Sequence, residues 1–289
     1  MTEAKKAKIK KSVKQFIGSL FGGDASFEVL RAMNRQKLLI IYYHRVLKPE
    51  DARKFRIPDM CTDIETFKEH IRFLSKHYTP VSEQDIILAL EAKGALPDFP
   101  VWVTFDDGYR DNFIHAYPVL KEFKVPATFF ISTGLINHSP KALVDLKTTL
   151  GIDTEKAQNL FMSWEQIREL SDQGFFIGGH TRSHRILTTL EGGQIEEEIV
   201  QCKQEIEKRI GRPIYSFAYP HGKRLDYPAE VCAPLLKKYG FKLAVSTIGG
   251  HNGPVSLQNQ YELRRVGIAF EEPFTFFKLK IGLGSSWQK

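Results

Sequence analysis

Short apolar runs recur along the 289-residue chain at intervals that suit buried strands. Each is bounded by polar or turn-forming residues, and most are rich in β-branched or aromatic side chains. Seven such runs are predicted to be strands, at Lys37–Tyr43, Phe99–Phe105, Ala127–Ile131, Phe175–Ile177, Tyr215–Ala218, Lys242–Ser246 and Glu262–Ile268. Runs of this kind are typical of strands covered on both faces.

Between these runs, apolar residues recur every three or four positions, which predicts amphipathic helices. Ile64, Phe67, Ile71 and Leu74 mark one apolar face, and Ser82–Lys93 is a second helix ended by Gly94. Further helices are expected to begin at Ser163, which has capping-box spacing to Gln166, to follow the stripe from Ile195 to Ile210, and to span Pro228–Tyr239. Alternating strands and helices predict an α/β fold with a mainly parallel sheet.

About seven parallel strands favour a closed or nearly closed barrel over an open sheet. In such folds the chemistry collects at the carboxyl ends of the strands. Asp106, Asp107, His180 and the loop 219–222 each follow a predicted strand directly. The pattern therefore predicts a functional site at that end of the barrel.

Composition and charge argue against a nucleic-acid-binding protein and against a thiolate zinc site. The chain is 42% hydrophobic with a net charge of +7, and it lacks the basic stripe with stacking aromatics that is typical of a nucleic-acid-binding module. The three cysteines, Cys61, Cys202 and Cys232, are widely spaced, and no CxxC pair suggests a thiolate zinc cluster. Free cysteines in a reducing cytoplasm are the simplest expectation.

The first 30 residues differ from the rest and are expected to form a basic amphipathic segment ahead of a single domain at 31–289. Within it, Lys5–Leu20 places apolar residues at helical spacing among six lysines. The stretch lacks the continuous apolar core of a signal peptide. Either it lies on an anionic membrane surface, or it packs on the domain and points its lysines to water. The basic, apolar Phe274–Ile281 favours membrane contact slightly.

Two stretches carry the candidate chemistry. Thr104–Tyr109 places adjacent carboxylates, Asp106 and Asp107, after a buried run, and Gly178–His184 holds two imidazoles four residues apart. His180, His184 and either carboxylate could hold a divalent ion, and zinc suits such a donor set. The other carboxylate would then act as a base. The non-functional alternatives are a solvated loop that happens to hold two aspartates and a pair of surface histidines that are four residues apart by chance.

In this order TFDDGY, the PATFF stretch at Pro126–Phe130 and the HTxxH motif resemble the polysaccharide deacetylases of carbohydrate esterase family 4, which carry the NodB homology domain. The resemblance covers roughly residues 37–270. It implies a distorted (β/α) barrel, Asp106 as the general base, and Asp107, His180 and His184 as ligands of a metal, which we expect to be Zn²⁺.

A third motif, Phe217–Gly222, departs from the family's usual form because it lacks an arginine and has His221 in place of an aromatic residue. The resemblance implies that the His221 N–H stabilises the oxyanion, for which the side chain is immaterial. Arg265 is expected either to steady the base or to be an ordinary surface or ion-paired arginine. Tyr109, Tyr219 and Pro220 are expected to contact substrate.

The proton for the leaving amine needs a donor, and two histidines qualify. His44 lies in a Y-H-x-V element that resembles the poly-N-acetylglucosamine deacetylase branch, to which the chain is most similar. His251 lies in a glycine-rich loop. We favour His44, with a buried structural histidine as its alternative.

The expected activity is removal of an acetyl group from an N-acetylated sugar or polysaccharide precursor. Two alternatives stay open: a degenerate sugar-binding or membrane-docked scaffold of the same fold, and a metal hydrolase of another amide or ester. The absence of an export signal favours a cytoplasmic protein, peripheral at the inner membrane face. The segment Asn137–Phe161 is expected to be either a lid or an ordinary insertion.

Overall fold

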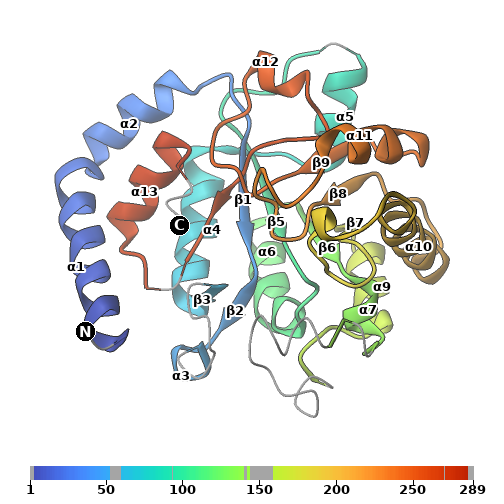
Figure 1. The fold of residues 1–289 in the computed structure, drawn as a ribbon. Coiled ribbons are helices and arrows are strands. Elements are labelled where there is room, and N and C mark those ends of the chain that lie inside the picture. The colour runs from blue at the N-terminus through green and yellow to red at the C-terminus, as the bar shows by residue number, and fades with distance from the viewer. Residues whose placement is uncertain are drawn as a thin grey trace.

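The computed structural model describes residues 3–52, 60–92, 94–139, 142–143, 159–269 and 271–285. Its centre is a curled, parallel α/β sheet (Figure 1). In spatial order the strands are β10 (Val266–Gly267), β1 (Leu39–Tyr43), β5 (Pro100–Phe105), β6 (Ala127–Ile131), β7 (Phe176–Gly179), β8 (Ser216–Ala218) and β9 (Leu243–Val245). All seven strands predicted from the sequence are therefore confirmed within a few residues.

The two edges of this sheet approach each other. Val245 in β9 forms a parallel bridge with Leu263, just before β10, and the Ser246 N–H donates to the Leu263 carbonyl. The sheet therefore curls toward a barrel. Its concave face holds one apolar cluster that includes Ile40, Trp102 and Phe130, while alternate residues of the same strands pack outward against helices.

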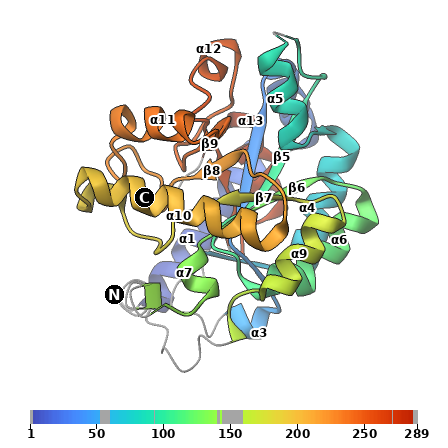
Figure 2. The ribbon, with the colours of Figure 1, turned by 90° about the vertical axis from the view of Figure 1, so that its right-hand side faces the viewer.

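Helices cover the convex face (Figure 2). They are α4 (Ile64–His77), α6 (Tyr117–Phe123), α9 (Trp164–Asp172), α10 (Gly192–Ile210) and α11 (Ala229–Lys238). The capping box of α9 is present, because the Ser163 hydroxyl accepts from the Gln166 N–H and the Gln166 side chain accepts from the Ser163 N–H. Gly211 ends α10 in the left-handed conformation.

Short elements connect these layers. Helix α5 (Glu83–Glu91) follows β4 (Thr79–Pro80), which pairs with β5, and β2 (Arg45–Leu47) pairs with β3 (Cys61–Asp63) in a separate ribbon. The remaining short pieces are α3 (Pro49–Ala52), η2 (Asn112–Ala116), α7 (Thr133–Ile136), η4 (Leu187–Thr189) and α12 (Pro254–Leu257).

Both ends of the chain meet on one side of the barrel, where α1 (Glu3–Phe21) and α2 (Asp24–Met33) pack against α13 (Phe274–Leu283) (Figure 1). Helix α2 continues across residue 30, the boundary expected from the sequence. Most of α13 is buried, so most side chains of Phe274–Ile281 pack inside the protein and are not available for the membrane contact that the sequence suggested. Its Lys278 pairs with Asp24 and its Lys280 with Glu272.

Glu83 carries a carboxylate buried among the strands of the sheet, where hydroxyl groups donate hydrogen bonds to it. Glu83, 2% exposed, accepts hydrogen bonds from the Ser216 hydroxyl at 2.5 Å and the Thr128 hydroxyl at 3.2 Å. Trp102 in turn donates to Thr128. Burial raises the pKa of Glu83 to about 7, against the hydroxyl hydrogen bonds that lower it.

The raised pKa of Glu83 predicts a stability that falls as the pH rises. Between its ordinary pKa of 4.5 and about 7, the folded chain binds more protons at Glu83 than the unfolded chain does. Glu83→Gln should therefore raise the free energy of unfolding above pH 7 by up to about 3 kcal/mol, with the gain shrinking toward about pH 5. Urea unfolding at several pH values measures this, with the exposed Glu69→Gln as control; a gain independent of pH would contradict it.

Candidate active site

The predicted site residues meet at the carboxyl ends of the strands. His44 follows β1, Asp106 and Asp107 follow β5, and His180 follows β7. Backbone hydrogen bonds extend the sheet into these positions, because the Asp106 N–H donates to Tyr43 and the His180 N–H donates to Ile131. Side chains far apart in the sequence therefore face one region.

Asp107, His180 and His184 form a compact group of potential metal ligands, with one donor atom of each within 4.8 Å of the others. The Asp107 Oδ1 atom lies 3.2 Å from His180 Nε2 and 3.1 Å from His184 Nε2. Ligand atoms about 2.0–2.2 Å from a tetrahedral ion are themselves about 3.4 Å apart. The spacing therefore suits a small divalent ion.

Hydrogen bonding supports the same conclusion. His180 Nδ1 lies 2.7 Å from the Ala218 carbonyl, which can only accept, so Nδ1 carries the proton and Nε2 presents its lone pair to Asp107. The buried Asp107 Oδ1 makes no hydrogen bond of good geometry. Two lone-pair atoms facing each other at 3.2 Å are an arrangement that a cation between them would satisfy.

Glu198 in α10 holds the loop that carries the histidines, and the sequence analysis missed it. This buried carboxylate accepts from the Ser183 N–H at 2.7 Å and from the Ser183 hydroxyl, and the Arg182 N–H donates to the Glu198 carbonyl. The His184 N–H donates to the Thr181 hydroxyl. No sequence signal marks Glu198, because α10 has four other glutamates, none of which is buried.

Asp106, the other carboxylate, is paired with Arg265. The guanidinium donates to both carboxylate oxygens at 2.8 Å, and neither side chain is more than 3% exposed. Arg265 also donates to the Ser246 carbonyl and to the Thr104 hydroxyl, and it stacks over Tyr42. Burial alone would raise the pKa of Asp106, but Arg265 outweighs burial, and the pKa is lowered. Of the two expectations for Arg265, the structure shows an ion pair with Asp106; that it steadies the base stays a prediction.

Backbone strain is concentrated around this site. Asp107, Thr181, His184 and His221 all have positive φ angles, of 74°, 60°, 57° and 58°. Non-glycine residues adopt this conformation at a cost, and such positions cluster at functional sites. Gly108, also at positive φ, packs against the Ile131 and Ile136 side chains.

The two candidate proton donors are at opposite ends of the barrel. His44 follows the last residue of β1, where the charges of Asp107 and Asp106 act on it; burial lowers its pKa more than they raise it. His251 precedes Asn252, which pairs with Leu38 at the beginning of β1. Five residues of strand separate these points, which is about 16 Å. The geometry thus sets His251 aside as the donor, and that His44 is the acid stays a prediction.

The remaining predicted residues lie around the group of potential metal ligands. The His221 ring lies 5.4 Å from that of His184. Tyr109 and Tyr219 are at most 1% exposed, and Pro220 is buried. The Tyr219 hydroxyl donates to the Tyr261 carbonyl, and its ring stacks on Tyr227. In this conformation both tyrosine rings pack within the protein, so the expected substrate contacts need them to move and stay predictions.

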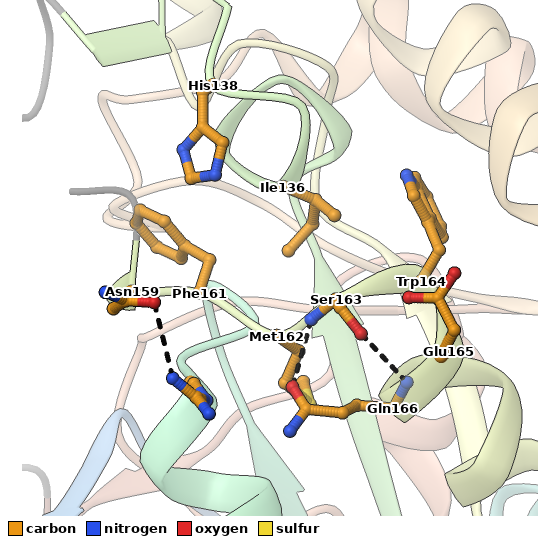
Figure 3. Close-up of a pocket in the computed structure, with 10 residues that line it drawn as sticks. Ile136, His138, Asn159, Phe161, Met162, Ser163, Trp164, Glu165 and Gln166 are labelled. Carbon is orange, nitrogen blue, oxygen red and sulfur yellow. Dashed lines mark hydrogen bonds between the residues drawn. The ribbon is translucent and has the colours of Figure 1, made fainter.

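A cavity of about 430 Å³ lies beside the Asp107 loop (Figure 3). The Met162 N–H donates to the Gly108 carbonyl, and the Tyr109 ring stacks on Phe161, so the cavity wall joins the loop directly. Ile136, His138, Phe161 and Trp164 line it. Much of the segment 137–161 lies outside the described residues, and its expected role as lid or insertion is untested.

Comparison with known proteins agrees with this geometry. The sequence profile "Polysaccharide deacetylase" matches residues 93–244, more than half of the chain. The protein YxkH of Bacillus subtilis is 25% identical over 265 residues, covering 91% of this chain and 83% of YxkH. The poly-beta-1,6-N-acetyl-D-glucosamine N-deacetylase of Staphylococcus aureus (strain MSSA476) is 25% identical over 249 residues, covering 80% and 78%.

Solved structures share the fold. The Streptococcus pyogenes deacetylase PplD superposes with a TM-score of 0.68 at 21% identity, over 86% of this chain and 99% of PplD. IcaB from Ammonifex degensii gives 0.67 at 23% identity, over 86% and 98%. The distorted barrel implied by the motifs is thus confirmed. The family's profile runs across the carboxylate pair and both histidines, and the chain belongs to the polysaccharide deacetylase family, carbohydrate esterase family 4 with the NodB fold.

Proposed function

We propose that this chain is a metal-dependent hydrolase that removes the acetyl group from an N-acetylated sugar. The observation that carries the proposal is that the two neighbouring carboxylates have different partners. Asp107 faces two imidazoles, whereas Asp106 is ionised beside Arg265 and remains available to take a proton. Members of the family are carbohydrate deacetylases, and the relatives include N-deacetylases of poly-N-acetylglucosamine.

Asp107, His180 and His184 would hold the ion, and the donor set favours Zn²⁺. When bound, such an ion supplies Lewis-acid catalysis at the acetyl carbonyl and makes a neighbouring water more acidic. Asp106 takes a proton from the water that attacks this carbonyl carbon. The His221 N–H donates to the oxygen on which negative charge develops. His44 gives a proton to the sugar nitrogen as the C–N bond breaks, releasing acetate and a free amine.

Acetate release from N-acetylglucosamine oligomers tests the proposal. The protein should release acetate when loaded with Zn²⁺, lose at least about 99% of this activity after chelation, and regain it with added metal. Elemental analysis should find about one ion per chain, lost in His180→Ala. Sugar binding without acetate release in the loaded protein would instead indicate a scaffold. Cleavage of other amides or esters alone would indicate a different hydrolase.

The role of His44 predicts a dependence on the leaving group. An amine must be protonated as it leaves, whereas an aryl alcohol leaves readily as its anion. His44→Ala should therefore lower kcat for the N-acetyl sugar by about 10²–10⁴-fold and kcat for an aryl acetate by far less. Parallel assays on both substrates measure this, with His251→Ala as the control. Equal losses on both substrates would remove His44 as the acid.

A further inference from the structure

We propose that the outer face of α1 docks this chain on an anionic membrane surface. This face is the stripe Val13, Phe16 and Leu20, which are 50%, 65% and 56% exposed. Phe21 beside it, and Val29 and Met33 in α2, are 56%, 62% and 71% exposed. Large exposed apolar side chains that follow one face of a helix, as in α1, mark an interaction site.

Close packing on the other side of α1 explains this exposure. Lys14, Gly18 and Gly22 are four residues apart and form the stripe that packs against α13. A Cβ atom on Gly18 would lie 2.7 Å from the Thr275 hydroxyl, and one on Gly22 would lie 2.0 Å from the Thr275 carbonyl oxygen. The helices can approach this closely only because both positions are glycine. The apolar stripe of α1 is therefore turned away from the barrel.

A buried ion cluster fixes the same orientation. Lys14 Nζ lies 2.8 Å from Glu272 Oε1, and both side chains are largely buried. Glu272 also accepts from Lys280 at 2.9 and 3.0 Å. A charged residue of α1 thus points into the protein while Phe16 points out, the reverse of an ordinary surface helix. Rolling the helix to bury Phe16 would leave the Glu272 cluster without Lys14.

Charge identifies the partner as anionic lipid. Lys5, Lys6, Lys8, Lys10 and Lys11 precede Lys14 along α1, and Glu3 is the only acidic residue among the first 22. Lysines next to exposed aromatic and leucine side chains suit the headgroup region of an anionic bilayer, where apolar burial and electrostatic attraction add. No helix in the described parts of the chain is long and apolar enough to cross a bilayer, so the contact is interfacial.

The docking would hold the candidate active site near the lipid. The lysine-rich beginning of α1 lies toward the same end of the molecule as α3, which closely follows the strand end that carries His44 (Figures 1 and 2). A substrate attached to the membrane could then reach the site without the chain leaving the surface. The inference itself rests on α1 and stands independently of the reaction that the site catalyses.

Vesicle sedimentation of the full chain tests the proposal. The protein should bind phosphatidylcholine vesicles that contain phosphatidylserine, and it should bind less to phosphatidylcholine alone and at high salt. Phe16→Ser combined with Leu20→Ser should weaken binding at least about tenfold. The control, Leu88→Ser with Ile114→Ser, removes comparably exposed apolar side chains elsewhere and should bind as the wild type does.

Further variants test the contribution of the lysines of α1 and the insertion of residue 16 into the bilayer. Replacing Lys5, Lys6, Lys8 and Lys10 by Gln should weaken binding and its salt dependence, unlike the same change at the exposed Lys76, Lys124, Lys208 and Lys237. The native cysteines are all buried, so Phe16→Cys can be labelled selectively with an environment-sensitive fluorophore. Its emission should shift to the blue with anionic vesicles, whereas a label at Leu88→Cys should not respond.

Three results would overturn the proposal. The first is no sedimentation of the wild type with anionic vesicles. The second is undiminished binding by a folded variant that carries both Phe16→Ser and Leu20→Ser. The third is a wild-type dimer that this double variant converts to a monomer without any effect on vesicles, because the stripe would then be a contact between copies of the chain.

Discussion

Asp106→Asn is expected to lower kcat for deacetylation by about 10²–10⁴-fold while the bound metal stays near one ion per chain. The amide has almost the same shape as the carboxylate and still accepts a hydrogen bond from Arg265, but it cannot take a proton from water. Asp106 is outside the ligand group, whose donor atoms belong to Asp107, His180 and His184. The metal site should therefore survive the change. Steady-state kinetics with elemental analysis of the same preparation measures both quantities.

Asp107→Asn is the matched control, since it makes the same change one residue away. It should lose the ion and, through that loss, the activity, because Asp107 Oδ1 lies within 3.2 Å of both imidazoles. If Asp106→Asn lost the metal and Asp107→Asn kept it, the two roles would be reversed. If Asp106→Asn kept full activity, the proposed base would be wrong.

Most strands were predictable because their runs are short, apolar and bounded by turns, although Glu262–Ile268 holds three charged residues. The structure buries β1, β5 and β6 at every position, which is why periodicity of two was absent and continuous apolarity was the signal. The outer side of α1 was harder to predict. Its apolar stripe is visible in the sequence, but its direction depends on Gly18 and Gly22 meeting Thr275, a contact between the two ends of the chain.

The site residues also fall into those that the sequence could predict and those that depend on tertiary packing. Asp106, Asp107, His180 and His184 could be found because each follows a predicted strand in a recognisable motif. Glu198 could not, since its contact with Ser183 depends on how α10 packs against the sheet. His44 was already favoured over His251 from its Y-H-x-V element, and the direction of β1 now gives a geometric reason for the same preference.

Arg265→Met is expected to cost about 3–5 kcal/mol of stability, because it leaves the buried Asp106 carboxylate without its partner. It should also change the pH dependence of activity. Arg265 holds the pKa of Asp106 below its ordinary value against burial, which acts to raise it. Without the guanidinium the pKa rises, so the base is protonated at a higher pH and the acid limb of kcat/KM moves upward. A purely structural arginine would lower stability without moving this limb.

The double variant, with Asp106→Asn and Arg265→Met together, tests the pairing itself. It should be more stable than Arg265→Met alone, because the amide needs no counter-ion, and the coupling energy should reach at least about 2 kcal/mol. Activity should stay as low as in Asp106→Asn. Arg264→Met, at the exposed neighbouring position, is the control and should change stability by less than about 0.5 kcal/mol. Additive losses in the cycle would show that the two side chains act separately, and the steadying role of Arg265 would fall with them.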